Sequence, residues 1–409
     1  MKSQMMKHGL YSLLIASTSL MAPAAFAQDS VVSLEEAIKS SKVLADFRLR
    51  YEGADFDGVS NDAVALTYRA RVGFETGAWA STKLLVEFDH VQALVDDFNS
   101  TINGNTTYPV IADPDVTELN RFQLTNTALP GTTVTIGRQR IVQDDSRFIG
   151  NVGWRQNEQT YDAVRIVNKS VENLTLDATY IDQVNRIFGD DSPGGRFDSD
   201  SWVLNAGYNL PMDGAKLKLS GYAYLLDLSN AGLSSQTIGA SATFKKGILG
   251  LKGAYAVQSD YGNQPVNYDA DYYFLEASLA KNGLSGAVGY EVLGSDGGVK
   301  AFTTPLATLH KFNGFADVFL GTPAGGLEDI YVKAGYKTKA VGILPFVNMF
   351  AVYHDFSADS GSADYGSEID AVVATKIGKT GVLFKYANYD ADAFATTRAR
   401  YSLQFDYKF

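Results

Sequence analysis

Apolar and polar residues alternate along most of the chain beyond residue 27, and the clearest example is the segment 398–409. Successive side chains of a β-strand point to opposite sides, so this segment predicts a strand with one apolar and one polar face. Similar alternation recurs around Leu66, Leu174, Trp202 and Ile238, and we count eighteen such segments. The apolar face of 398–409 consists of Ala399, Tyr401, Leu403, Phe405, Tyr407 and Phe409.

The connections between these segments alternate between short and long, which predicts the topology. Several short ones carry turn chemistry, such as Asn282-Gly283. Short periplasmic turns and long extracellular loops are typical of a transmembrane antiparallel β-barrel, here of about 18 strands. A closed barrel also leaves no unpaired strand edge in lipid. A soluble β-helix or large sandwich is the alternative fold, but neither explains this alternation. The longer loops are 53–62, 92–117, 142–159, 183–200, 227–236, 259–270, 294–328, 357–366 and 390–396.

The first 27 residues have the pattern of a signal peptide. Lys2 and Lys7 precede the apolar stretch 10–20, and Ala25-Phe26-Ala27 is the small-x-small pattern that signal peptidase cleaves. A membrane anchor is the alternative, but the stretch is too short to span about 30 Å as a helix. We therefore predict a signal peptide over 1–27, a short periplasmic segment over 28–42 and an outer-membrane barrel over 43–409.

The segment 28–42 also carries a helix signal. Ser33 and Glu36 form a capping box, which predicts a short helix reaching about Lys42. The apolar-faced last strand ends at Phe409, which resembles the recognition signal of outer-membrane barrel proteins. The barrel assembly machinery and outer-membrane lipid are therefore expected partners.

Composition narrows the function classes. The chain has 35 Lys+Arg against 46 Asp+Glu, a formal net charge of −11 and no Cys. The absence of Cys excludes disulfides, a thiol nucleophile and Cys-ligated zinc, and the acidic balance argues against nucleic acid as a partner. Abundant aromatic residues, 23 Tyr and 23 Phe, suit a membrane surface. The bacterial outer membrane is the expected location.

Arginine is concentrated in the first and last predicted strands. The first and last strands of a closed barrel are neighbours, and alternation places these arginines on the inner face. An arginine facing lipid near the midplane costs about 2–4 kcal/mol, which agrees with an inward orientation. Arg138 and Arg140 fit less well, because they share parity with the apolar Ile136; a bulge at Gly137 or a position above the membrane would explain this. The expected lumen residues are Arg48, Arg50, Arg69, Arg71, Arg121, Arg165, Arg398 and Arg400.

Several segments resemble the alginate export family of outer-membrane porins. They are 48–52 (Arg-Leu-Arg-Tyr-Glu), 137–162, with Gly137-Arg138-Gln139-Arg140 and Trp154-Arg155-Gln156-Asn157, and 302–317. The resemblance implies a monomeric 18-stranded barrel with an electropositive pore. It also implies passage of anionic or sugar-like solutes, with a polyuronate such as alginate as one of them. An Arg-lined pore favours anions on physical grounds too. The alternatives are a wall stiffened by Arg–carboxylate pairs and a non-conducting structural or adhesin-type barrel.

Catalytic and metal sites are not expected. Only His90, His310 and His354 follow the signal peptide, and none has a base or nucleophile at suitable spacing. No cofactor is expected, although acid pairs such as Asp113/Asp115 and Asp190/Asp191 suit a loop calcium ion. Solvated loop charge is the alternative explanation for them.

Two long loops, 142–159 and 294–328, carry more apolar surface than exposed loops normally do, including Trp154 and Phe302. We expect them to fold together over or into the barrel mouth, with Arg147, Arg155 and Lys311 as the charged rim of a constriction. A lid that only caps the extracellular end is the alternative.

Overall fold

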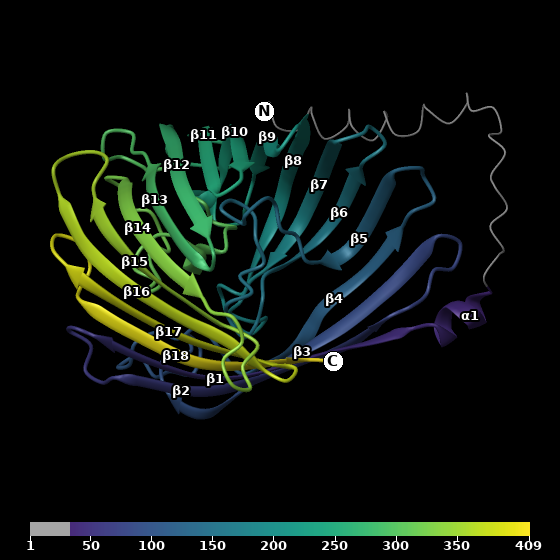
Figure 1. Cartoon of the computed structure of the whole chain (residues 1–409), viewed down its shortest axis with the longest axis horizontal. Helices are drawn as coiled ribbons and strands as arrows, with labels where there is room; N and C mark the ends of the chain where they lie inside the picture. Colours follow the sequence, from purple (N-terminus) through teal and green to yellow (C-terminus); the bar gives the residue numbers. More distant parts are fainter. Residues whose placement is uncertain (1–32) are drawn as a thin grey trace.

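The computed structural model describes residues 33–409, and an 18-stranded antiparallel sheet dominates it (Figure 1). Each strand pairs with the next along the chain, and β1 also pairs with β18, so the sheet closes into a barrel. This confirms the predicted fold class. The strands are β1 Lys42–Phe56, β2 Ala63–Glu75, β3 Thr82–Asp97, β4 Val116–Asn126, β5 Thr132–Gln139, β6 Thr160–Asn168, β7 Leu174–Asn185, β8 Arg196–Met212, β9 Ala215–Leu226, β10 Ser235–Lys246, β11 Leu249–Ser259, β12 Asp269–Lys281, β13 Leu284–Leu293, β14 Leu327–Lys337, β15 Val347–Ser357, β16 Asp364–Ile377, β17 Thr380–Ala391 and β18 Arg398–Lys408.

A short helix, α1 (Leu34–Lys39), precedes the barrel. Its capping box forms as predicted, with the Glu36 N–H donating to Ser33 Oγ at 3.1 Å. The helix ends at Lys39 rather than near Lys42, because Lys42 already belongs to β1 and pairs with Glu75 of β2. The predicted signal peptide, 1–27, and residues 28–32 lie outside the described residues. Two 3₁₀ turns, η1 (Ala231–Leu233) and η2 (Leu309–Lys311), lie in loops.

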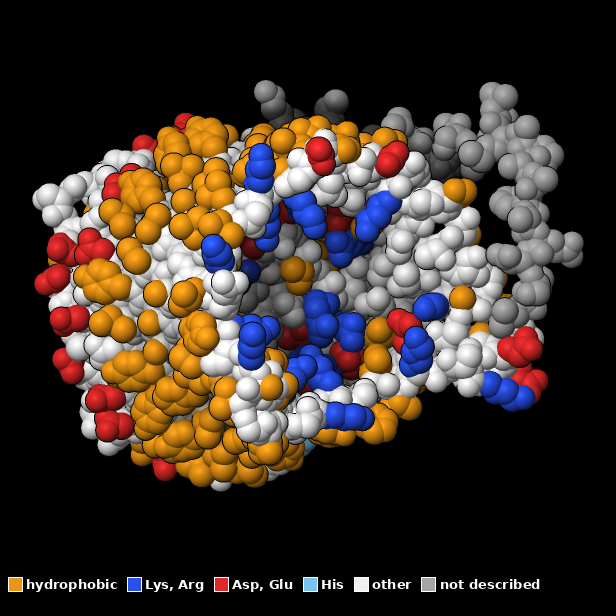
Figure 2. Space-filling model, in the orientation of Figure 1, with side chains coloured by type: hydrophobic (Ala, Val, Ile, Leu, Met, Phe, Trp, Pro, Cys, Tyr) orange, Lys and Arg blue, Asp and Glu red, His pale blue; other side chains and the backbone are white. Residues whose placement is uncertain are grey.

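The alternation of the strands separates two environments. Outward side chains are apolar and exposed, such as Leu275 at 65% and Val288 at 54%. The space-filling view shows apolar side chains over much of the outer wall (Figure 2). Such a surface suits the hydrocarbon of a membrane. Among residues 33–409, no helix is long and apolar enough to span a membrane.

The two ends of the barrel differ. The Gly77 N–H donates to Ala37 O at 2.9 Å, so α1 lies at the end that carries the short turns. The longer loops leave the opposite end, and three of them, 98–115, 140–159 and 294–326, fold back inside the barrel. We call these three the inner loops. The largest apolar cluster forms where loops 140–159 and 294–326 meet the wall; it includes Ile149, Phe302, Leu306, Tyr222 and Tyr272. Loop 98–115 packs in a separate, smaller cluster with Ala54, Ala63 and Ala65.

Candidate solute pathway in the barrel lumen

The arginines of β1, β2 and β18 lie side by side across the seam where the barrel closes. Arg48 is directly opposite Arg69 on β2 and Asp406 on β18. The residues that alternate with Arg48, such as Phe47 and Leu49, are exposed on the outer wall. The six arginines of this seam therefore face the lumen. They are Arg48, Arg50, Arg69, Arg71, Arg398 and Arg400.

Most of these guanidinium groups are covered rather than open to the lumen. Arg50 is 0% and Arg69 2% exposed, and Arg400 reaches only 8%. Five of the six bond to a carboxylate: for example, Arg50 lies 3.3 Å from Asp113 and Arg69 2.5 Å from Asp46. The remaining pairs are Arg48–Asp406, Arg71–Asp89, Arg71–Glu158 and Arg400–Glu52. Arg398 instead donates to Thr396 O at 3.3 Å.

The side chains of the seam arginines also donate hydrogen bonds to backbone carbonyls of the inner loops. Arg48 Nη1 donates to three consecutive carbonyls, those of Gly153, Trp154 and Arg155, at 3.0–3.2 Å. Arg400 donates to Val110 O at 2.9 Å and to Ala316 O at 3.1 Å. Guanidinium groups are suited to this task because their five donors are fixed in one plane. The seam is thus a clamp on all three inner loops.

The other predicted lumen arginines lie on separate strands. Arg121 is 2.7 Å from Glu87 and Arg165 is 2.5 Å from Asp177, and both are partly exposed. Arg138 keeps the outward parity of Ile136 and pairs at 2.8 Å with Asp162, its cross-strand neighbour on β6. No register shift accompanies it, so a bulge is not the explanation.

Arg140 lies beyond the end of β5 and forms an ion pair with Glu158 of the same inner loop. Its parity with Ile136 therefore has no consequence for orientation, because strand alternation applies only within β5.

The inner loops 140–159 and 294–326 pack against each other along their backbones. Ile149 and Leu306 form a parallel β-bridge, and the Gly150 N–H donates to Leu306 O at 2.8 Å. The Thr308 N–H donates to Ser146 O at 3.0 Å. The two loops that carried unusual apolar surface are therefore joined inside the barrel, where that surface is buried.

Arg147 and Arg155 are interior ion pairs rather than an open rim. Arg147 is 3% exposed and its Nε lies 2.7 Å from Glu291 on β13. Arg155 is 5% exposed and contacts Glu52 at 3.1 Å and Asp317 at 3.5 Å. Lys311 differs, because its side chain is exposed and donates to Asp145 O at 2.6 Å.

A buried histidine fixes loop 294–326 to the wall. His310 Nδ1 lies 2.7 Å from Asp317 and Nε2 lies 2.8 Å from Lys385 Nζ on β17. Since an ammonium group only donates, Nε2 accepts and the ring is neutral. The ring stacks on Trp154 with centroids 4.4 Å apart. Burial lowers the pKa of His310 to about 3, and the pKa of Asp317 is lowered as well by His310 and two arginines despite its burial.

The open part of the lumen is lined by lysines, of which only Lys311 was predicted from the sequence. A cavity of about 600 Å³ lies between the inner loops and the wall from β9 to β16. Figure 2 shows a hollow in the molecule whose visible rim carries more Lys and Arg than Asp and Glu. The lysines that line the cavity are Lys218, Lys252, Lys311 and Lys333.

Further lysines face inward near the short turns. Lys216 shares the parity of Lys218 and is directly opposite Lys245 on β10. On β14, Lys337 shares the parity of Lys333, and on β16, Lys376 shares the parity of Asp370; both Lys333 and Asp370 line the cavity. All four are exposed, and none forms an ion pair with a carboxylate in the part of the chain described. The alternation rule that located the arginines would have found these lysines too.

The acid pairs considered for calcium have other partners. Asp113 accepts from Arg50, and Asp190 lies 2.9 Å from Arg196. Across residues 33–409, no group of three or more His, Asp or Glu is placed to hold a metal ion. His90 points to the outer wall, where it bonds to Tyr68 at 3.0 Å, and His354 bonds to Asp329 at 2.9 Å.

Solved structures of outer-membrane channels resemble the chain along most of its length. Pseudomonas aeruginosa OccK9 (OpdG) is 17% identical, with a TM-score of 0.71, and the match covers 91% of this chain and 100% of that one. Pseudomonas aeruginosa OpdK with vanillate is 15% identical, with a TM-score of 0.71 and coverage of 91% and 99%. Identities this low show the fold alone.

A comparison of the sequence with models of protein families shows the family as well as the fold. No curated protein sequence matches the chain. The sequence model of the family described as Campylobacter major outer membrane protein matches residues 6–389. The resemblance to the alginate export family receives no support, since the family that matches is a different one. The chain therefore belongs to the Campylobacter major outer membrane protein family and is a porin of the bacterial outer membrane.

Proposed function

We propose that this porin gives passive passage to small solutes and favours anions. The observation that supports this best is the set of lysines that face open lumen. Lys311 and Lys333 line the cavity without an ion pair to any described carboxylate, and Lys333 instead lies 4.0 Å from the Phe350 ring. Ammonium groups with access to water attract anions within about 10 Å at 0.1 M salt.

The carboxylates around the same cavity are largely compensated. Asp144 lies 2.5 Å from Lys218, and Asp145 pairs with Lys252. Glu291 is buried against Arg147, and Asp329 against His354. Glu276 and Asp370 remain; the Tyr331 hydroxyl donates to Glu276 at 2.7 Å, and Asp370 lies 3.7 Å from His354 Nε2. Together with the unpaired lysines near the short turns, this leaves the open lumen with a positive balance.

The seam arginines have a structural part in this proposal. Their charge is matched by nearby carboxylates, and their donors are used on the inner loops. A polymer such as alginate would have to displace those loops, which are held by many bonds. We therefore place small anionic or sugar-like solutes before a polyuronate.

The alternative is a barrel closed by its inner loops, with a structural or adhesin-type role. The dense bonding of Arg147 and Arg155 favours it. Single-channel recording in planar bilayers separates the two functions. Discrete conductance steps with the purified, folded chain are expected, and a folded barrel that inserts without conducting would support the closed barrel instead.

A further inference from the structure

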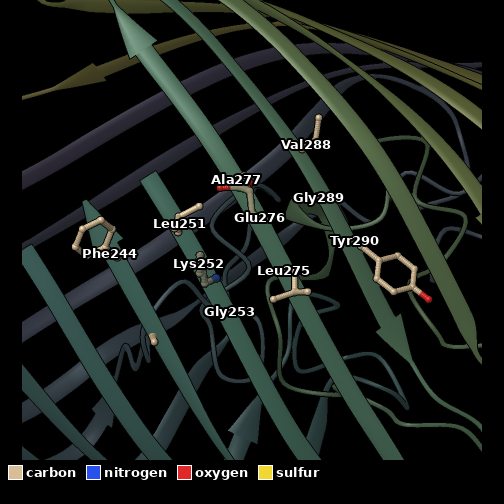
Figure 3. Close-up of a pocket in the computed structure, with 11 residues that line it drawn as sticks. Phe244, Leu251, Lys252, Gly253, Leu275, Glu276, Ala277, Val288, Gly289 and Tyr290 are labelled. Carbon is tan, nitrogen blue, oxygen red and sulfur yellow. The ribbon is translucent and has the colours of Figure 1, made fainter. Parts of the chain in front are cut away.

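The outer wall is hollowed between β10 and β13. A groove of about 510 Å³ lies there, and Figure 3 shows the side chains that line it. Its floor is made of the small residues Ala242, Gly253 and Ala277; Ala242 is directly opposite Gly253 on the neighbouring strand. Larger apolar residues surround them, namely Phe244, Leu251, Leu275, Val288 and Tyr290.

The groove faces lipid rather than the lumen. Leu275 and Val288 are more than half exposed, as outward residues of a barrel are. Lys252, which alternates with Leu251 and Gly253, belongs to the lumen cavity on the other side of the wall. The groove is therefore an apolar hollow within the membrane-facing surface.

Two lysines lie at the short-turn end of the same strands. Lys246 shares the outward parity of Phe244, and Lys281 shares that of Leu279. Both are exposed, and neither forms an ion pair with a carboxylate among residues 33–409. Four residues separate Ala242 from Lys246, or about 13 Å along a strand. The short turns of such a barrel lie on the periplasmic side, so the two lysines lie on the headgroup side of the groove in the periplasmic leaflet.

We propose that this face binds an anionic phospholipid of the periplasmic leaflet. One acyl chain fills the groove over Ala242, Gly253 and Ala277, and the phosphate lies between Lys246 and Lys281. The apolar hollow and the unpaired cations match the two ends of such a lipid. Ammonium groups at the membrane surface attract anionic headgroups, whereas a groove alone would hold any acyl chain.

The chain contains a second groove that serves as a control. It has a volume of about 390 Å³, lies between β6 and β9, and includes the small residues Ala178, Ala206 and Gly221. The two turns at the matching end of this groove, β6–β7 and β8–β9, carry the acids Glu172 and Asp213. The β6–β7 turn also carries Lys169, but Lys169 lines a cavity in the lumen. It has the apolar hollow without the outward cations, so it should not select anionic lipid.

The test uses the full chain reconstituted in vesicles of equal phosphatidylglycerol and phosphatidylcholine. After mild extraction in detergent, native mass spectrometry counts the lipids that stay bound. Retained phosphatidylglycerol should exceed phosphatidylcholine in the natural sequence. Each lysine is worth about fivefold in affinity, so Lys246→Gln with Lys281→Gln should weaken retention roughly 25-fold.

Ala277→Leu should also release the lipid, because the larger leucine side chain occupies the floor of the groove. Ala206→Leu in the second groove should leave retention unchanged. A heat-modifiable band on electrophoresis confirms that each variant is folded. Equal retention of the two lipids, or unchanged retention in the lysine and Ala277 variants, would overturn the proposal. A changed number of chains per particle with unchanged lipid would instead identify the face as a contact between copies, and would overturn it too.

Discussion

A single guanidinium, that of Arg155, joins three parts of the chain. It lies within 3.5 Å of Glu52 on β1, Asp113 in loop 98–115 and Asp317 in loop 294–326. Removing one partner of a buried ion pair leaves uncompensated charge and costs about 3–5 kcal/mol. We expect Arg155→Gln to lower markedly the temperature at which half of the protein leaves the folded, heat-modifiable band on electrophoresis.

The matched control is Arg196→Gln. Arg196 pairs with Asp190, and both side chains are nearly half exposed, at 47% and 45%. Exposed pairs contribute about 0–1 kcal/mol, so this variant should melt close to the natural sequence. Equal losses in the two variants would contradict the stabilising role that we assign to the buried ion pairs of Arg155.

His310 makes the packing of loop 294–326 sensitive to acid. Its folded pKa, about 3, lies below the unfolded value of 6.5 because of burial. Only the unfolded state gains a proton between these values, so stability that is complete above pH 6.5 is lost as the pH falls toward 3. At pH 5 the loss is about 2 kcal/mol, at 1.36 kcal/mol for each pH unit.

Proteolysis of the inner loops at pH 7 and pH 5 measures this loss. The natural sequence should be cleaved faster at pH 5, and His310→Asn should show a smaller difference between the two pH values. The lowered pKa of Asp317 acts in the same direction at still lower pH. A cleavage rate that is independent of pH in the natural sequence would rule out this role for His310.

At the scale of elements, the inner loops determine how much lumen is open. Deleting 300–313 removes the β-bridge at Leu306 and part of the apolar cluster around Phe302. Single-channel conductance should rise and anion preference should fall, since Lys311 leaves the lumen. Deleting the exposed loop tip 101–106 is the control and should change neither quantity. Unchanged conductance in a folded 300–313 deletion would mean that these residues do not constrict the pore.

Elements and side-chain partners differ in how far they are predictable. Alternation within a strand depends only on local geometry, so segments such as 398–409 and the lumen orientation of Arg48 follow from sequence. The partner of Arg147, Glu291, is 144 residues away on β13 and meets it only because loop 140–159 folds inward. No local pattern reports such a contact, so the burial of the arginines was not predictable. The inward-facing lysines on the strands follow the same alternation rule as the arginines, yet Lys311, in an inner loop, is the only lumen lysine that was predicted from the sequence.

At the scale of the whole molecule, closure of the barrel depends on the seam between β1 and β18. Gly53 is opposite Tyr401 there, and a Cβ at Gly53 would lie 2.3 Å from Tyr401 Cζ. Gly53→Ala should displace the Tyr401 ring and cost about 0.5–1.5 kcal/mol. Gly221→Ala is the control, since nothing lies within 4 Å of its Cβ position. Thermal midpoints of the folded band compare the two, and a seam variant as stable as the control would show that this contact does not matter for closure.

Ion selectivity is a property of the whole molecule, because the electrostatic potential in the lumen depends on all the charges along it. Lys216→Gln with Lys245→Gln removes two unpaired inward charges and should reduce anion preference. The outward pair, Lys246→Gln with Lys281→Gln, changes the net charge equally and should leave selectivity as it is. Equal effects from the two pairs would mean that net charge, rather than the lumen field, determines selectivity.

If the lumen lysines act as proposed, this porin conducts and favours anions. The zero-current potential across a bilayer that separates dilute from concentrated potassium chloride tests it most directly. We expect a potential of the sign set by chloride permeation, decreasing as both salt concentrations are raised and the lysines are screened. A potential of the sign set by potassium permeation at low salt would contradict it.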